Sequence, residues 1–364
     1  MTRRNLTTTE REPFHPSGVA ALTMDTPTPT PTPDPDLTPT PTPTPTPGTE
    51  GGFSHLPVML DEILAILEPV PAGILLDATL GGGGHASALL EARPDCRLLG
   101  IDRDIDAIDA AGQRLEPFGE RVELVHAAFG DLGQVLDDAL GSEPLVGFLF
   151  DLGVSSPQLD RPDRGFSYRE SGPLDMRMDR RQAMTADDVV NGYAESDLAT
   201  VLRAHGDERY ARRIAAVLVA ARPVTDTRHL ADLVREAIPA PARRRGGHPA
   251  KRTFQALRIE VNEELAQLPH ALDLAVEHLA TGGRGAVLAY HSGEDRIVKQ
   301  RFDLAATGGC ACPARLPCGC GALAIARTLG RGARLPTKVE QAGNRRAASA
   351  RLRVLERIEP ESRS

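Results

Sequence analysis

The sequence has no tryptophan and only four tyrosines, so aromatic residues make up 4% of its 364 positions. A hydrophobic core must therefore be built mainly from leucine, valine, isoleucine and alanine. No apolar run reaches the roughly 18 residues that a membrane-spanning helix needs. The basic N-terminus is not followed by the apolar stretch of a signal peptide. These absences predict a cytoplasmic protein with no membrane partner.

Cysteine is also scarce, and the 50 acidic residues outnumber the 42 basic ones. Five cysteines in a chain of this length do not form a disulfide framework. The net charge is -8, so the overall charge does not indicate a nucleic-acid-binding protein. Any contact with nucleic acid must come from local basic patches.

Residues 1–50 form a low-complexity tail, with threonine and proline alternating over most of 26–47. Proline removes backbone donors and favours extended conformations, so this segment is predicted to be disordered. Two alternatives stay open. The tail is a docking peptide, or translation starts downstream, for example at Met24.

Buried strands and amphipathic helices alternate after the tail, beginning near His55. This alternation predicts an α/β fold with a parallel, doubly wound, Rossmann-like sheet. Strands are expected at 74–78, 97–102, 122–126 and 145–151, and helices at 86–92, 105–115 and 132–140.

The alternation stops between about Arg161 and Leu272, where the patterns are helical. It resumes with a helix at 272–279 and a strand at 285–291. An all-helical subdomain at 161–272 is therefore expected inside a sheet domain formed by 51–160 and 273–358. Helices are expected in it at 211–221, 230–237 and 253–265.

A glycine run, 81–84, lies between the first strand and its helix. Glycines there let the backbone approach a ligand closely. Asp102 ends the next strand at about the 20-residue spacing of an acid that binds ribose hydroxyls. Asp77 precedes the run and would repel a pyrophosphate, but it suits the positive groups of S-adenosylmethionine. Phe129 either flanks an adenine or belongs to the core.

The fourth strand ends in Asp151 and is followed by Ser155, Ser156, Pro157 and Gln158. A small polar segment with proline at this position is similar to the motif of enzymes that methylate exocyclic amines. The lone pair of such an amine is delocalised into its ring. Acceptors that hold the amine hydrogens turn the lone pair toward the methyl group, and the remaining requirement is alignment.

Seven ordered blocks, spanning about His55 to Glu356, resemble the bacterial ribosomal RNA small subunit methyltransferase H family, also called MraW. The blocks are LDATLGGGGH (76–85), GIDRD (100–104), DLGVSSPQLD (151–160), RGFSY (164–168), GPLDMRMD (172–179), HPAKRTFQALRIEVN (248–262) and HSGEDRIVK (291–299). The resemblance implies a class I methyltransferase domain with an inserted helical domain, and N4-methylation of one cytosine in the decoding region of 16S rRNA.

The resemblance also implies site residues. The cofactor contacts carried onto this chain are Gly83, Gly84, His85, Asp102, Phe129, Asp151 and Gln158. The catalytic set is Asp151, Ser155, Ser156 and Pro157. This chain departs from the family at Gly293, where leucine is usual, and at Leu80, where a larger residue is common.

Arginine and lysine gather in the helical region, and such clusters bind phosphates. The cluster consists of Arg177, Arg180, Arg181, Arg209, Arg212, Arg213, Arg243, Arg244, Arg245, Lys251 and Arg252. Arg177, Lys251 and Arg252 are the expected contacts to 16S rRNA in the small ribosomal subunit. The segment from Arg164 to Asp179 is expected to cover a flipped cytosine. A homodimer remains one option for the oligomeric state.

Two further patterns allow two interpretations each. His291 and Ser292 either line the base pocket, or Ser292 or Asp295 caps the next helix. No metal is expected in the catalytic site, but four cysteines form a possible zinc set, the alternative being a loop of reduced thiols. The set is Cys310, Cys312, Cys318 and Cys320.

Other activities also remain open: a DNA amino-methyltransferase, a nucleotide-binding dehydrogenase, and an RNA-binding assembly factor without catalysis.

Overall fold

The computed structural model describes residues 57–243, 247–313, 319–344 and 346–362. The Thr/Pro-rich tail, Arg244, Arg245 and Cys318 lie outside the described residues. Within them, no helix is both long and apolar enough to cross a membrane.

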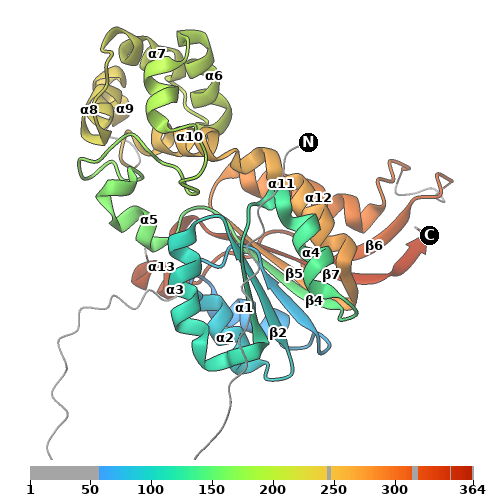
Figure 1. The fold of residues 1–364 in the computed structure, drawn as a ribbon. Coiled ribbons are helices and arrows are strands. Elements are labelled where there is room, and N and C mark those ends of the chain that lie inside the picture. Colours follow the sequence, from blue (N-terminus) through green and yellow to red (C-terminus); the bar gives the residue numbers. More distant parts are fainter. Residues whose placement is uncertain (1–56, 244–246, 314–318, 345, 363–364) are drawn as a thin grey trace, which may run out of the picture. The chain divides into compact units, whose positions relative to one another are not determined.

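A seven-stranded sheet with the order β3-β2-β1-β4-β5-β7-β6 forms the centre of the fold (Figure 1). Neighbouring strands from β1 to β5 pair in parallel, whereas β7 runs antiparallel to both β5 and β6. The strands are β1 (Ile74–Asp77), β2 (Arg97–Asp102), β3 (Val122–His126), β4 (Leu145–Asp151), β5 (Leu279–Ala289), β6 (Leu323–Thr328) and β7 (Arg351–Ser362).

This order confirms the Rossmann-like class I fold, with one correction. The sheet is mixed rather than wholly parallel, because β6 and β7 extend it beyond β5. β5 also begins at Leu279, before the expected residue 285. Strand β7 alternates charged and apolar residues, and it is stabilised by its neighbours on either side rather than by a continuous apolar run.

Helices cover both faces of the sheet (Figure 1). One face packs against α1 (Leu60–Leu67), α2 (Gly84–Ala92) and α3 (Ile105–Leu115). The other packs against α4 (Leu132–Leu140), α11 (Glu264–His278) and α12 (Ser292–Thr307). Burial on both faces explains why β1 and β4 are apolar at almost every position.

Between β4 and β5 the chain forms a second hydrophobic core, which includes Phe166, Met176, Leu202, Leu218 and Leu257. The helices that contribute to it or border it are α5 (Ser156–Asp160), α6 (Glu195–Gly206), α7 (Ala211–Ala220), α8 (Thr227–Ala237), α9 (Ala240–Arg243) and α10 (Lys251–Asn262). A short helix near the C-terminus, α13 (Lys338–Gly343), completes the set.

The boundary between α10 and α11 differs from the expected helices at 253–265 and 272–279. Helix α10 ends at Asn262, Glu263 adopts a left-handed conformation with φ 49°, and α11 starts at Glu264. The Arg258 guanidinium pairs with the Glu264 carboxylate at 2.8 Å across this turn. No glycine marks the break, so the local sequence provides no sign of it.

Gly285 provides a test of core packing between β4 and β5. It lies directly opposite Phe148, and a Cβ atom at Gly285 would lie 2.0 Å from the Phe148 ring. We expect Gly285→Ala to lower the free energy of unfolding by about 1–3 kcal/mol, measured by denaturant unfolding. Gly332→Ala is the control, because a Cβ there meets nothing within 4 Å. Equal stability of the two variants would contradict this account of the packing.

Candidate active site

A cavity of about 1360 Å³ opens at the carboxyl ends of the parallel strands. Its walls include Ala78 after β1, Asp102 on β2, Asp151 on β4 and Tyr290 after β5. The neighbours β1 and β4 are where the strand order reverses. Open α/β sheets bind their ligands in the crevice at such a position.

The glycine turn forms one wall of the cavity. Gly81 and Gly83 have φ angles of 51° and 72°, a region that favours glycine. The Gly81 amide donates a hydrogen bond of 2.9 Å to Oδ2 of Asp102. A Cβ on Gly84 would lie 2.8 Å from Pro57, so only glycine fits there without a shift. Gly84 lines the cavity, whereas Gly83 packs behind it against Ala111.

Three carboxyl groups, those of Asp77, Asp102 and Asp151, lie at the ends of β1, β2 and β4. Asp102 and Asp151 line the cavity, whereas the buried Asp77 does not. Burial raises the pKa of Asp77 to about 7, and the charges of Asp151 and Asp102 add to the rise. Burial raises the pKa of Asp102 to about 6, although amide donors from Asp104 and Gly81 oppose it. A cation would stabilise the ionised forms of these acids. The donor set therefore fits a positively charged cofactor such as S-adenosylmethionine.

Asp151 lies at the centre of a hydrogen-bond network. Its Oδ1 accepts a 2.6 Å bond from the Tyr290 hydroxyl, and its backbone amide donates to Oγ1 of Thr79. Its Oδ2 lies 3.7 Å from Nδ1 of the buried His85, whose Nε2 donates to the carbonyl oxygen of Val58 at 3.0 Å. Burial raises the pKa of Asp151, although His85 opposes the rise.

Tyr290 is a site residue that sequence reasoning missed. It follows β5 and lines the cavity, and burial beside Asp151 raises the pKa of its phenol above the ordinary value. The only available signal was its position at the end of a buried strand, immediately before the His-Ser block.

Gln158 is buried and lines the cavity, but its amide group is engaged within the protein. Its Nε2 donates to Oδ2 of Asp104 at 2.8 Å, and its Oε1 accepts from the Ser155 amide at 3.0 Å. Gln158 therefore holds the segment after β4 against the start of α3. Ser155 and Pro157 line the cavity, and Ser156 begins α5.

Arg164, only 2% exposed, donates to the same Asp104 oxygen at 2.8 Å. It also donates to Asp106 and to the carbonyl oxygens of Arg177 and Met178. From the sequence, Arg164 is expected only as the first residue of a segment over the base. The structure shows that it joins α3 to the chain that leads into the second core.

Phe129 lies just after β3 and lines the cavity. Its ring packs at 5.4 Å, centroid to centroid, against Phe150 of β4. It thus belongs both to the edge of the core and to the cavity wall.

The expected RNA contacts lie in different surroundings. Lys251, at the start of α10, is exposed and lines the cavity. Arg252 is exposed beside it and donates to the Asp207 carbonyl oxygen at 3.0 Å. Arg177 is half-buried, and its guanidinium binds both oxygens of Asp175. Neither Arg252 nor Arg177 lines the cavity.

The start of α12 agrees with one part of the expectations for the His-Ser block and differs in the rest: His291 lines the cavity as expected, Ser292 does not, and the helix cap is His291 rather than Ser292 or Asp295. His291 caps the helix, because its Nδ1 accepts from the amides of Gly293 and Glu294, and it also lines the cavity. Ser292 donates instead to the carboxylate of Asp207 at 2.6 Å. Asp295 pairs with Arg353 at 2.7 Å.

The family model of the MraW methylases matches residues 52–358. The ribosomal RNA small subunit methyltransferase H of Thermobifida fusca is 53% identical, over 84% of this chain and 93% of that protein. The enzyme of the same name from Frankia alni is 52% identical, over 84% and 96%. A solved structure of a putative rRNA methylase from Clostridium thermocellum aligns with 84% of this chain and 100% of that chain, at 13% identity and a TM-score of 0.39.

The buried acids predict that S-adenosylmethionine binds more weakly as the pH falls. A bound cation favours the ionised forms of the acids near it. These are Asp102, which lines the cavity, and the buried Asp77, and their pKa values are about 6 and about 7. Below these values binding must release protons, so the Kd should rise up to about tenfold per pH unit for each proton released. Calorimetry from about pH 8 to about pH 5.5, in buffers of different ionisation enthalpy, counts those protons.

The matched variants are Asp77→Asn and Asp102→Asn, which should bind more weakly at high pH and show a flatter pH profile. A Kd for the unaltered protein that does not change over this range would contradict the proposed electrostatics.

Proposed function

The chain belongs to the MraW methylase family, which uses S-adenosylmethionine, and on this basis we propose that it methylates the RNA of the small ribosomal subunit. Within that RNA, we propose the exocyclic N4 amine of one cytosine in the decoding region of 16S rRNA as the target. The observation that carries the proposal is the mixed lining of the cavity. It is lined by carboxylates at the sheet edge, by Lys251 at the start of α10 and by apolar side chains of the second core.

The size of the cavity supports two occupants. Its volume of about 1360 Å³ exceeds the roughly 300–1,000 Å³ of a pocket for one small ligand. Phe166, Tyr168, Met176 and Met178 line it on the side of the second core. A pyrimidine base fits such an apolar wall, while the cofactor fits the acidic wall.

S-adenosylmethionine, when bound, supplies an electrophilic methyl group. On the acidic wall, Asp102 would accept hydrogen bonds from the ribose, and Phe129 would flank the adenine. The glycine turn with Gly84 would let the backbone approach the cofactor, and His85 and Gln158 would hold the surrounding wall. Gly83 would support this turn from behind.

The methyl-accepting amine must be aligned rather than strongly deprotonated. Asp151 lines the cavity, and its Oδ1 accepts from the Tyr290 hydroxyl. Its other oxygen, Oδ2, would accept a hydrogen of the amine. The segment with Ser155, Ser156 and Pro157 would fix the plane of the base. Once the amine is methylated it becomes acidic, and Asp151 can accept its proton because its pKa is raised by burial.

Access to the amine requires that the cytosine leave its stack, because N4 lies on the pairing edge. We assign the segment 164–179 to cover the extruded base. We assign residues 161–262, which end with α10, to a helical domain that recognises the substrate, because the expected boundary at 272 falls inside α11, which packs on the sheet. Lys251, which lines the cavity, and the exposed Arg252 beside it would bind RNA phosphates. Arg177, whose guanidinium is held in place by Asp175, would bind a further RNA phosphate.

The first test concerns the reaction. We expect tritium from labelled S-adenosylmethionine to enter small ribosomal subunits from cells lacking the protein, at one cytosine, and not to enter duplex DNA. Methylation of DNA instead, or of another position or atom in rRNA, would refute the proposed target.

The second test concerns Asp151 and Tyr290. We expect Asp151→Asn to lower kcat by about 10²-fold or more, since the amide can still accept a hydrogen bond but cannot take the proton that the amine releases. Tyr290→Phe keeps the ring and removes the hydrogen bond. It should lower kcat less, leave KM for rRNA nearly unchanged and shift the pH profile of kcat. A Tyr290→Phe profile identical to that of the unaltered enzyme would show that the hydroxyl does not position Asp151.

The third test concerns RNA binding. Replacing Lys251 and Arg252 together by alanine should weaken rRNA binding. It should also reduce the slope of log Kd against log salt by about 1 for each phosphate that the variant no longer binds. Arg97→Ala is the control, because Arg97 begins β2 at the opposite edge of the sheet and pairs with Glu143. Equal affinity and slope for both variants would refute the assigned RNA-binding role.

A further inference from the structure

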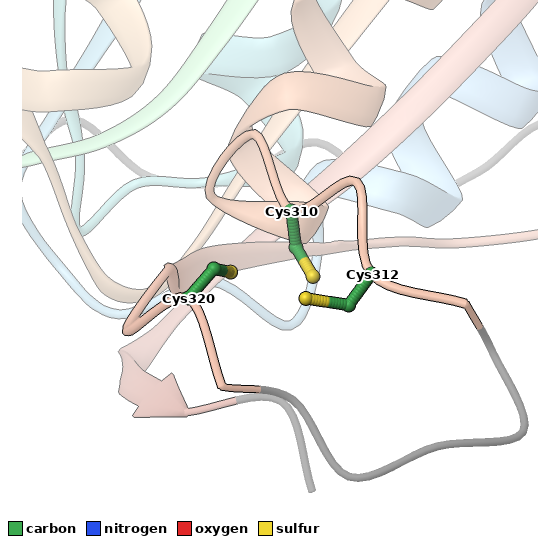
Figure 2. A group of neighbouring side chains, drawn as sticks. All are labelled: Cys310, Cys312 and Cys320. Atoms are coloured by element: carbon green, nitrogen blue, oxygen red, sulfur yellow. The ribbon is translucent and has the colours of Figure 1, made fainter.

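Three cysteines gather in the connection between α12 and β6. The sulfur atoms of Cys310, Cys312 and Cys320 all lie within 4.8 Å of one another. Figure 2 shows the sulfurs of Cys310 and Cys312 turned toward each other, with Cys320 coming from the segment that leads into β6. No other group of metal-ligating side chains was found among the described residues. None of these three cysteines lines the cavity.

The backbone brings the two sides of this connection together. Helix α12 ends in Gly308 and Gly309, with φ angles of 59° and 75°. A Cβ on Gly308 would lie 2.3 Å from the carbonyl oxygen of Leu323, the first residue of β6. The Cys310 amide then donates to the Thr307 carbonyl oxygen at 3.1 Å. These backbone contacts hold the end of α12, with Cys310, close to the start of β6.

The spacing of the sulfurs fits a tetrahedral metal ion. Zinc–thiolate bonds of about 2.3 Å place the sulfurs about 3.8 Å apart, which lies within the observed limit. Thiolates are soft ligands that select zinc over magnesium or calcium. Only one residue separates Cys310 from Cys312, fewer than in most zinc sites. Cys320, however, comes from the segment that leads into β6, so the three sulfurs belong to two separate parts of the connection.

We propose that Cys310, Cys312 and Cys320 bind one Zn²⁺ ion, with the fourth position taken by water or a further side chain. The ion would fasten β6, the last strand of the sheet order, to the end of α12. Helix α12 has 16 residues and is about 24 Å long, and its opposite end is capped by His291 beside the cavity. The zinc is therefore structural, and its loss should affect stability rather than methyl transfer.

Metal content tests the site directly. The protein, expressed with added zinc and purified without a histidine tag or chelator, should carry about one zinc per chain by mass spectrometry of the elements. The double variant Cys310→Ser with Cys320→Ser should lose nearly all of it. Cys96→Ala is the control and should keep the metal, because Cys96 is buried in the core under the other face of the sheet.

A second measurement on the unaltered chain keeps the test decisive if the double variant does not fold. Chelation should remove the zinc and lower the unfolding temperature by several degrees, and zinc should restore it. Cobalt(II) added to the stripped, reduced protein should give the charge-transfer absorption of thiolate ligands. Methyl transfer by the stripped protein, assayed well below its unfolding temperature, should be unchanged.

Three outcomes would overturn the proposal. The first is a reduced protein that carries no zinc and takes up neither zinc nor cobalt. The second is a folded double variant that retains the zinc of the unaltered chain. The third is a disulfide between two of these cysteines. It would be indicated if two thiols of protein purified under reducing conditions resisted alkylation and became reactive after a stronger reductant but not after a chelator.

Discussion

The buried guanidinium of Arg164 is the interaction on which the two cores and the cavity between them depend. A buried charge is costly unless its donors are satisfied. Arg164 meets this condition by binding Asp104 and Asp106 at the start of α3 and two backbone carbonyl groups of the segment that follows. Asp104 also accepts a hydrogen bond from Gln158. Its carboxylate therefore connects the start of α3 with the segment after β4 and with the chain that leads into the second core.

Asn262 reinforces the same junction from the end of α10. Its side chain accepts from the Met178 amide and donates to the Met176 carbonyl oxygen. Met176 and Met178 line the cavity, so the position of its apolar wall is set by polar groups behind it. The acidic side of the cavity has the opposite character: Asp102 lines it, and Asp77 is buried at the end of the neighbouring strand β1. Asp77 and Asp102 are buried at a cost that raises their pKa values, and a cationic ligand would offset this cost.

Helix α12 links two regions with different chemistry. Its first turn is capped by His291, next to Tyr290 and the carboxyl group of Asp151. Its last turn leads into the cysteine cluster and the edge strand β6. A packed helix of this length separates the two regions, and each end can thus be tested with little direct effect on the other.

Elements whose pattern is local could be predicted from the sequence alone. The bounds of β2, β3, β4, α3 and α4 agree with those expected, because buried strands and amphipathic helices carry their own periodicity. The position of the cavity could also be predicted from Asp102 and Asp151, because acids at the ends of parallel strands meet at one edge of a sheet.

Which side chains work together depended on the tertiary structure. Tyr290 lies 139 residues from Asp151, and Arg164 lies 60 residues from Asp104, so no local pattern indicates either pair. The same holds for the left-handed Glu263, which follows from packing between α10 and α11 rather than from glycine. The cysteines were visible in the sequence as a spacing, but their approach to within 4.8 Å depends on the close packing of the α12 end against β6. Periodicity is encoded in neighbours along the chain, whereas these contacts arise only when distant segments fold against each other.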